Sequence, residues 1–125
     1  MKNLLIVMAG SALGGGARYV TSELSARSVG AAFPFATIGI NVVGSFLLVL
    51  VMQVSLTSSP LSPETRLFVT TGVLGGFTTY SSFNYEAIKL IQEGTPLLGI
   101  LNVAATVILC LSAGALAVFV ARLAT

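Results

Sequence analysis

Two long stretches without a charged residue constrain this chain more than any other feature. Residues 34–55 and 94–121 carry no Asp, Glu, Lys or Arg, and each is long enough as a helix to cross a bilayer core, which takes roughly 20 residues. Hydrophobic residues make up 55% of the 125 residues and charged residues 8%, whereas a typical soluble domain is roughly a quarter charged. The sequence therefore predicts an all-α membrane protein.

Two further spans complete a predicted bundle of four helices. Residues 67–85 are uncharged between Arg66 and Glu86, and a first span starts at Asn3 and passes Arg18 before it ends. Prolines in the connections favour turns and helix starts; they are Pro60, Pro63 and Pro96. We predict one domain over residues 1–125, with transmembrane helices at 3–25, 34–55, 65–92 and 96–122. Because three more spans follow the first, we do not expect a cleaved signal peptide.

Composition excludes several classes of function. The six basic residues form no run, so we expect no nucleic-acid partner. A single cysteine, Cys110, excludes an internal disulfide, and the chain has no histidine, so a zinc site of the usual kinds lacks ligands. Without a histidine base or an evident Ser-Lys pair, we do not expect an enzyme.

Basic side chains divide almost evenly between the two sides of the membrane. Four spans place both termini and the loop at Pro60 on one side. The basic residues of that side are Lys2, Arg66 and Arg122, and those of the other side are Arg27, Lys89 and, if it reaches that surface, Arg18. The asymmetry that normally fixes orientation is therefore missing. Either the six charges are too few to fix the orientation of the chain in the membrane, or the chain inserts in both orientations. In the second case it would form an antiparallel homodimer with twofold symmetry.

The third span contains an unusual polar stretch, GGFTTYSSF, at residues 75–83. Thr79, Ser82 and Glu86 recur at i, i+3 and i+7, which places them along one helical stripe, with Tyr80 and Phe83 beside it. Polar side chains in hydrocarbon normally face a neighbouring helix or a water-filled cavity. The hydroxyls either line such a cavity or bond back to their own helix.

The glycine pair before Thr78 predicts a break near the middle of the third helix. A break exposes backbone carbonyls, which are tolerated only inside protein or along a cavity and need a partner such as a cation. The alternative is that Gly75 and Gly76 only permit close helix packing.

Two other polar positions also have two interpretations. Asn41, inside the second span, either cross-links helices or acts as a ligand for a permeating species. Gly10 and Gly14 form a GxxxG pattern, with Arg18 one turn further. That pattern indicates either helix packing with an arginine reaching the interface or a fixed positive charge at an aqueous vestibule.

Three motifs together resemble the Fluc/CrcB family of fluoride channels along nearly the whole chain. They are GxxxGxxARY at 10–19, PxxTxxxN at 34–41 and GxLGGFTTYSSF at 72–83, of which the third is the most specific. The resemblance implies an antiparallel dual-topology homodimer with two fluoride pores and a sodium ion at its centre. It also implies that the backbone carbonyls of Gly75 and Thr78 hold that sodium.

The resemblance further assigns residues to the pore. Asn41 is the pore amide, Tyr80 and Phe83 are the aromatic wall, Arg18 is the vestibule arginine and Glu86 is the acidic residue farther along the third helix. The remaining pore positions are hydroxyls: Thr37, Thr79, Ser81 and Ser82. Amide and hydroxyl donors in series can replace the water of a small anion, and aromatic edges carry partial positive charge.

The chain also departs from the family pattern. Tyr80 stands where phenylalanine is usual, and Cys110 falls about where a pore serine is expected, with Thr106 and Ser112 nearby. These changes leave open which residues of the fourth span line the pore.

The implied function is passive export of fluoride across the plasma (inner) membrane, with no nucleotide or redox cofactor. The alternative is a small multidrug transporter, which needs a membrane-buried carboxylate in its first span. Here the only acidic residue of that span is Glu23, near its end.

Overall fold

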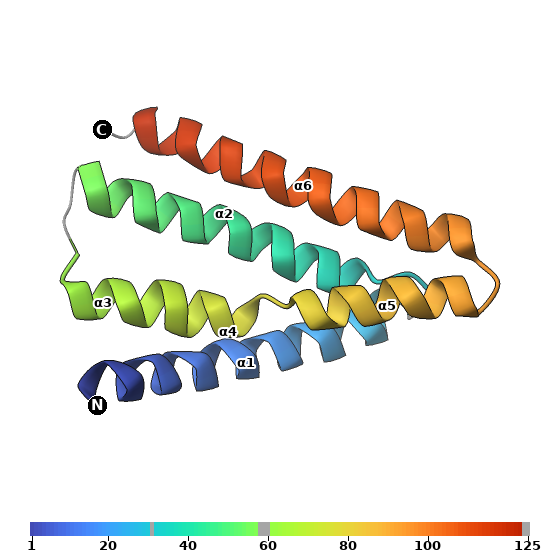
Figure 1. Ribbon diagram of the computed structural model, residues 1–125, viewed down its shortest axis with the longest axis horizontal. Coiled ribbons are helices and arrows are strands. Elements are labelled where there is room, and N and C mark those ends of the chain that lie inside the picture. Colours follow the sequence, from blue (N-terminus) through green and yellow to red (C-terminus); the bar gives the residue numbers. More distant parts are fainter. Residues whose placement is uncertain (31, 58–60, 124–125) are drawn as a thin grey trace.

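The computed structural model describes residues 1–30, 32–57 and 61–123, and it is helical with no strand within them. The elements in chain order are α1 (Lys2–Val29), α2 (Phe35–Thr57), α3 (Pro63–Leu67), η1 (Phe68–Leu74), α4 (Gly75–Phe77), α5 (Tyr80–Gln92) and α6 (Pro96–Leu123). They form an elongated bundle in which α1 begins and α6 ends at the same end (Figure 1). The predicted all-α architecture is confirmed.

Three helices, α1, α2 and α6, are long and apolar enough to cross a membrane by length and composition. The elements from α3 to α5 follow one another in a single row beside α1 (Figure 1). This row occupies the place of the predicted third span, but it is divided into short pieces, the longest of which is α5 with 13 residues. Within the described residues, the bundle therefore contains three continuous helices of spanning length and one interrupted row.

The helix boundaries differ from the prediction mainly in α1. This helix continues to Val29, beyond the predicted end at residue 25, and Gly30 ends it with φ 82°, a backbone conformation open to glycine. In the added turn, the hydroxyl of Ser28 donates to the carbonyl of Leu24 at 2.9 Å, so this side chain satisfies its own hydrogen bond. The predicted turn residue Pro60 lies outside the described residues.

The third span is interrupted near its middle, as predicted, but the break lies at Thr78 and Thr79, and the glycine pair before them is helical within α4. Thr78 has φ −73° and ψ 156°, and Thr79 has φ −150° and ψ 118°, so both are extended between α4 and α5. Just before the break, η1 is a seven-residue π-helix. The sequence analysis did not predict it, and such segments are rare and often mark functional regions.

Glycines bring the backbone of α1 against η1 and α4. A Cβ atom added to Gly10 would lie 2.7 Å from the Cα of Gly72, and one added to Gly76 would lie 2.7 Å from the carbonyl oxygen of Ser11. Gly14 similarly faces the carbonyl of Val73. The close-packing interpretation of these glycines is therefore confirmed.

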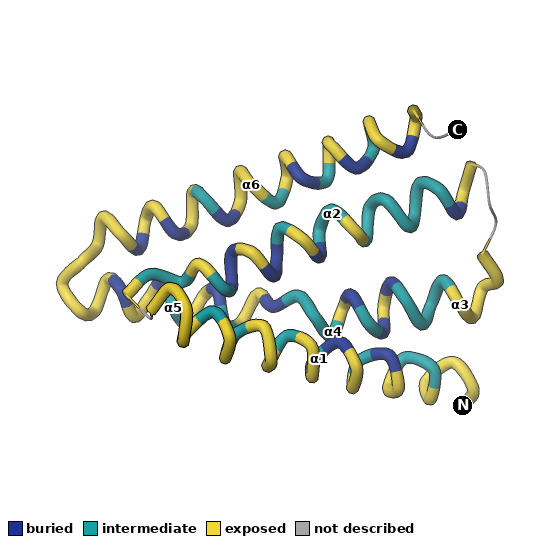
Figure 2. The backbone as a smooth tube through the Cα atoms, turned by 180° about the vertical axis from the view of Figure 1, so that it is seen from behind, coloured by how far each residue is buried: buried dark blue, intermediate teal, exposed yellow. Residues whose placement is uncertain are grey.

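Buried positions lie on the sides of the helices that face their neighbours, and in α6 that side faces α2 (Figure 2). The buried residues of α6 are mostly small: Gly99, Asn102, Thr106, Ala113, Ala117 and Ala121. Large apolar side chains such as Leu111 and Phe119 project outward instead. This distribution suits a bundle whose outer surface meets lipid or another apolar surface.

We predict that Gly14→Ala lowers the melting temperature of the purified protein, because the added methyl overlaps the backbone of Val73 and overpacking costs about 1–3 kcal/mol. Gly15→Ala is the matched control, since a Cβ at Gly15 meets nothing within 4 Å. Thermal unfolding followed by circular dichroism in detergent measures both variants. Equal melting temperatures for the two variants would contradict the proposed contact.

Candidate functional site

The side chain of Asn41 holds the break in the third span. Its Nδ2 donates to the carbonyl oxygen of Thr79 at 2.9 Å, and its Oδ1 accepts from the amide of Thr79 at 2.8 Å. Asn41 is 9% exposed and Thr79 is 7% exposed, so the pair is shielded from solvent. In a continuous α-helix the amide of Thr79 would donate to Gly75, so this pairing also deprives the Gly75 carbonyl of its usual donor.

Thr79 is the N-cap residue of α5 and lies close to two neighbouring hydroxyls. Its Oγ1 accepts from the amide of Ser82 at 3.1 Å, which caps the helix. The same Oγ1 lies 3.0 Å from Oγ of Ser82 and 3.3 Å from Oγ of Ser81. Three hydroxyls therefore meet at the first turn after the break.

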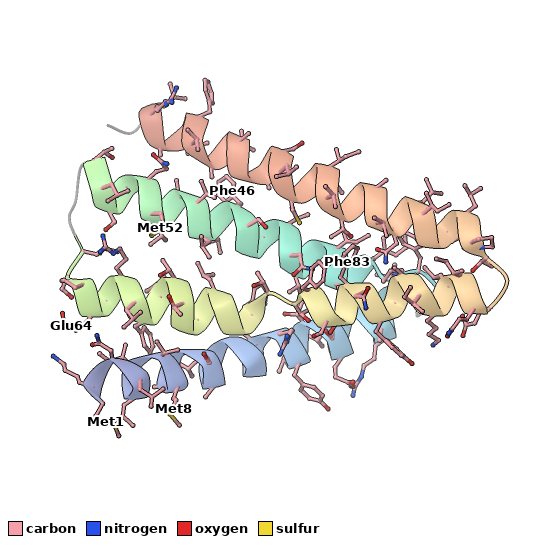
Figure 3. The ribbon with its side chains drawn as sticks, viewed as in Figure 1. Met1, Met8, Phe46, Met52, Glu64 and Phe83 are labelled. Atoms are coloured by element: carbon pink, nitrogen blue, oxygen red, sulfur yellow. The ribbon has the colours of Figure 1, made fainter. Side chains whose placement is uncertain are left out.

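An open pocket of about 760 Å³ lies between α2, α6 and the start of α5. Its polar end is formed by Asn41 and Thr79, and Tyr80 and Phe83 stand beside them. The two rings are 5.5 Å apart between centroids, in an edge-to-face arrangement with a 62° interplanar angle. Phe83 is 8% exposed and Tyr80 is 78% exposed, and Figure 3 labels Phe83 where α5 approaches α2. We name this cavity the aromatic pocket.

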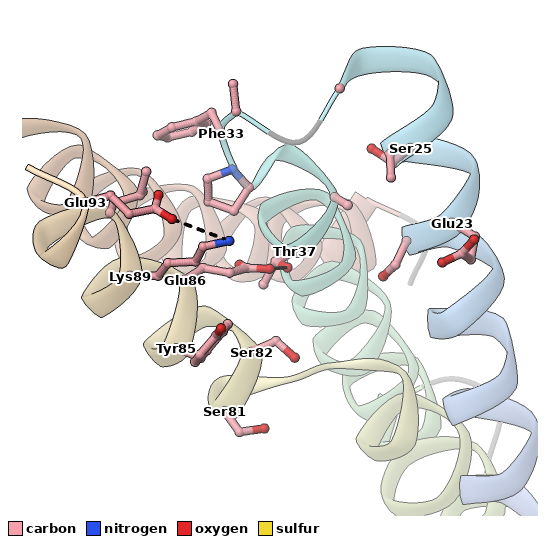
Figure 4. A pocket seen from close by; sticks show the side chains of 17 residues that line it. Glu23, Ser25, Phe33, Thr37, Ser81, Ser82, Tyr85, Glu86, Lys89 and Glu93 are labelled. Carbon is pink, nitrogen blue, oxygen red and sulfur yellow. Dashed lines mark hydrogen bonds and ion pairs between the residues drawn. The ribbon is translucent and has the colours of Figure 1, made fainter. Parts of the chain in front are cut away.

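A second pocket, of about 610 Å³, lies where α5 meets the C-terminal part of α1 and the start of α2. Figure 4 shows its labelled polar side chains, with Thr37 and Glu86 facing each other. The hydroxyl of Thr37 donates to Oε1 of Glu86 at 2.7 Å, while Oε2 of Glu86 is buried with no hydrogen-bond partner among the described residues. Lys89 faces Glu93 at 3.7 Å. We name this cavity the carboxylate pocket.

The two pockets adjoin at the hydroxyls of Thr79 and Ser82. Thr79 lines the aromatic pocket and Ser82 lines the carboxylate pocket, and their oxygens are 3.0 Å apart. On α2, Asn41 and Thr37 divide between the pockets in the same way, one turn apart. The residues predicted for the pore therefore fall into two groups that meet at one polar junction. Ser81 belongs with the carboxylate pocket.

The predicted sodium ligands and the predicted vestibule arginine lie together beside the break. Nη1 of Arg18 donates to the carbonyl oxygen of Thr78 at 3.4 Å. Within the described part of the chain Arg18 lines neither pocket. Gly75 is exposed on the outer surface of the row. Arg18 thus sits near the middle of the bundle and not at either end.

The fourth-span candidates separate in the structure. Thr106 is buried, Cys110 is half-buried, and both line the aromatic pocket. Ser112 is exposed and is absent from the lining of either pocket in the described residues. Only the first two therefore share a cavity with Asn41 and Phe83.

Comparison with known proteins places the chain in a family. The model of the CrcB-like protein family, Camphor Resistance (CrcB), matches residues 5–118. The chain belongs to the CrcB family. The chain is 48% identical over 122 residues to a protein of Anaeromyxobacter dehalogenans named fluoride-specific ion channel FluC, covering 98% of this chain and 97% of that one.

Two other relatives carry the same name. The protein of Sorangium cellulosum is 48% identical over 113 residues, covering 90% of this chain and 89% of the relative. The protein of Geobacter sulfurreducens is 42% identical over 111 residues, covering 89% and 90%. The similarity to CrcB relatives therefore includes all the elements that build the two pockets.

Sequence reasoning missed two contacts of this CrcB protein. It left Asn41 between a helix cross-link and a ligand, and the structure adds that both ends of its amide bind one residue, Thr79. It also gave no partner for Glu86, and the structure shows that the hydroxyl of Thr37 donates to its carboxylate. A broken helix leaves an orphaned amide and carbonyl that a single Asn side chain can satisfy together, which is the signal that could have suggested the first contact.

We predict that Asn41→Leu destabilises the fold by about 2–6 kcal/mol, because it leaves both backbone groups of Thr79 unpaired at about 1–3 kcal/mol each. The control is Asn84→Leu, which replaces an exposed amide on α5. Unfolding in detergent, compared between the two variants and the natural protein, measures the effect. Equal stability of the two variants would argue against the Asn41 bridge.

Proposed function

We propose that two copies of this chain form a fluoride-selective channel that exports fluoride passively across the plasma membrane. The observation that carries the proposal is the polar junction between the two pockets, where Asn41, Thr79 and Ser82 meet between apolar helices. The names of the relatives give independent support, since they are called fluoride-specific ion channels.

The junction has the donors that a dehydrated anion requires. Asn41 gives one N–H to Thr79, so its second N–H remains to donate to an ion. The hydroxyls of Ser81 and Ser82 lie in the carboxylate pocket, 3.3 Å and 3.0 Å from the hydroxyl of Thr79. Several weak donor positions in series let an ion enter without being trapped. Fluoride would pass from one pocket to the other along this series.

Phe83 contributes to the path without a fixed charge. Its ring lies against Tyr80 in an edge-to-face arrangement, and ring edges carry partial positive charge that favours an anion. The Tyr80 hydroxyl is an added donor at the exposed rim of the aromatic pocket. A cation at this position would bind fluoride more tightly and slow its departure.

Glu86 would make the carboxylate pocket less favourable for fluoride. A carboxylate repels an anion, and here Oε1 of Glu86 also accepts a hydrogen bond from the hydroxyl of Thr37. Thr37 can therefore donate to fluoride only when this bond opens. We assign Glu86 an electrostatic role in the carboxylate pocket and Thr37 a conditional donor role.

The proposed assembly is an antiparallel, dual-topology homodimer with four spans in each chain and two pores. The row from α3 to α5 would be the third span, because its length from Pro63 to Gln92 matches a crossing with one interruption. Arg18 lies at the break, which leaves three basic residues at one end of the bundle and two at the other. Such balance gives little preference for one orientation.

A sodium ion is proposed at the centre of this dimer, and the residues fit it in part. Carbonyl oxygens suit a hard cation, and the Gly75 carbonyl lacks its α-helical donor because Thr79 pairs with Asn41. The Thr78 carbonyl accepts from Arg18 in the single chain, so Arg18 would have to turn away. A bound sodium would supply the positive charge that the carbonyl oxygens of Gly75 and Thr78 would then face.

The multidrug-transporter alternative is not favoured. It requires a carboxylate buried in the membrane part of the first span, but Glu23 is exposed and lies 3.8 Å from Arg27, its partner one turn on. The carboxylate is therefore already paired at the surface.

Export needs no nucleotide or redox cofactor under this proposal. Hydrogen fluoride diffuses inward, dissociates at cytoplasmic pH and leaves as the ion, driven by a negative interior that contributes about 2.3 kcal/mol per 100 mV for each charge.

We predict that liposomes containing the purified protein, loaded with fluoride and supplied with a potassium ionophore as charge shunt, release fluoride far faster than chloride. Only a donor-lined path can replace the water of the smaller ion. A fluoride electrode measures release, and protein-free liposomes are the control. Equal rates for the two anions, or no release, would refute the proposal.

We predict that Phe83→Ile slows fluoride release by at least about tenfold, because the aromatic edge beside the junction is lost. The control is Phe119→Ile, which makes the same change at an exposed position of α6. Gel filtration establishes that both variants keep the natural assembly state. If a well-assembled Phe83 variant transports as fast as the control, Phe83 does not line the path.

A further inference from the structure

Ser45 is a half-buried residue of α2 to which no sequence motif assigned a role. It lines the aromatic pocket four residues after Asn41, so the two side chains lie one turn apart on the same side of α2. The residue before it, Gly44, packs against the side chain of Thr78, and a Cβ atom added to Gly44 would overlap the Cγ2 of that threonine. This contact holds α2 against the break, and Ser45 is therefore held one turn from the polar junction.

Most of the hydroxyls that line the aromatic pocket are already used within the chain. The hydroxyl of Thr78 donates to a carbonyl one turn earlier, that of Thr106 donates to a side chain of α6, and that of Thr79 donates within the first turn of α5. The hydroxyls of Ser45 and Tyr80 make no hydrogen bond to other described residues. Because Tyr80 is 78% exposed at the rim, Ser45 carries the half-buried pocket hydroxyl that is still able to donate.

The Ser45 hydroxyl has a local acceptor that it does not use. In other helical turns of this chain, the hydroxyls of Thr21 and Ser28 donate to the carbonyl four residues earlier, at 2.9 Å in each case. The corresponding acceptor for Ser45 is the backbone carbonyl of Asn41, and no such bond is present. A hydroxyl within a membrane span normally makes this bond, because lipid offers no other partner. The unused O–H group therefore remains available to a guest in the pocket.

The groups that remain unpaired at this position favour an anion over a cation. Oδ1 of Asn41 accepts from the amide of Thr79, so the part of the Asn41 amide that is left over is an N–H donor. The Ser45 hydroxyl adds a second donor one turn away. Among the described residues, those that line the aromatic pocket include no charged side chain. An anion here therefore meets neither a carboxylate that repels it nor a fixed cation that holds it too tightly.

We infer that Ser45 is a fluoride-contacting residue of the channel, and that its hydroxyl and the second N–H of Asn41 form a two-donor site in the aromatic pocket. This inference rests on the proposed function. The site extends the donor series on α2 by one turn beyond the junction. A fluoride ion that leaves the junction keeps a protein donor at Ser45 while it regains its water, which lowers the cost of departure.

The test uses Ser45→Ala in the full-length protein, reconstituted in liposomes in parallel with the natural protein and a Ser112→Ala control. Alanine removes the hydroxyl and keeps nearly the same volume, so a serine that serves only as a small packing residue predicts unchanged fluoride release. The inference predicts an unchanged melting temperature with fluoride release at least about tenfold slower, the factor for losing one hydrogen bond to a charged group. Ser112 is exposed on α6, and its variant should transport as the natural protein does.

A second variant, Ser45→Thr, separates the hydroxyl from the packing. Threonine keeps the O–H donor and adds a methyl group, which the open pocket can accept, so the inference predicts faster release than from Ser45→Ala. A packing role predicts the reverse order, because the added methyl disturbs packing more than the loss of an oxygen does.

Three results would overturn the inference. They are unchanged release by Ser45→Ala, release by Ser45→Thr that is as slow as that by Ser45→Ala, and slow release by Ser45→Ala that comes with a lower melting temperature or an altered gel-filtration profile. If the natural protein itself released no fluoride, the proposed function would fail first, so the two failures are distinguishable.

Discussion

The bridge between Asn41 and the backbone of Thr79 is the interaction on which the rest of the site depends. A membrane helix cannot break without leaving amide and carbonyl groups unpaired in a medium that offers no water. Asn41 satisfies both groups of the residue at the break. This allows a new helix, α5, to begin after Thr79, which caps it. The new helix positions the serine hydroxyls and the Tyr80–Phe83 ring pair, and the Gly75 carbonyl loses its helical donor.

The glycine contacts provide the second constraint, because they fix the row that contains the break. Gly10 and Gly14 of α1 lie against the backbone of η1 and α4, so the half-row before the break is held by α1. The half-row after it packs on α6 through Gly99. The break therefore separates a segment packed against α1 from a segment packed against α6. The polar junction forms between these two segments.

The division of the polar residues into two pockets gives the proposed channel a directional order. A fluoride ion would meet hydroxyls and the Glu86 carboxylate at one end and aromatic edges at the other, with Asn41 between them. Because Thr37 is bonded to Glu86, the donors of the carboxylate pocket are not all available at once.

The sequence by itself determined the class of protein and the position of the break. Charge-free stretches set the helices, because a charge in hydrocarbon is costly, and the stretch from Gly75 to Thr79 predicted an interruption, which the structure places at Thr78 and Thr79. The tertiary structure alone decided which groups meet. Asn41 bonds to Thr79, 38 residues later in the sequence. Thr37 bonds to Glu86, 49 residues later. Neither partner follows from local spacing, and the π-helix and the burial of Asn102 likewise depend on how the helices pack together.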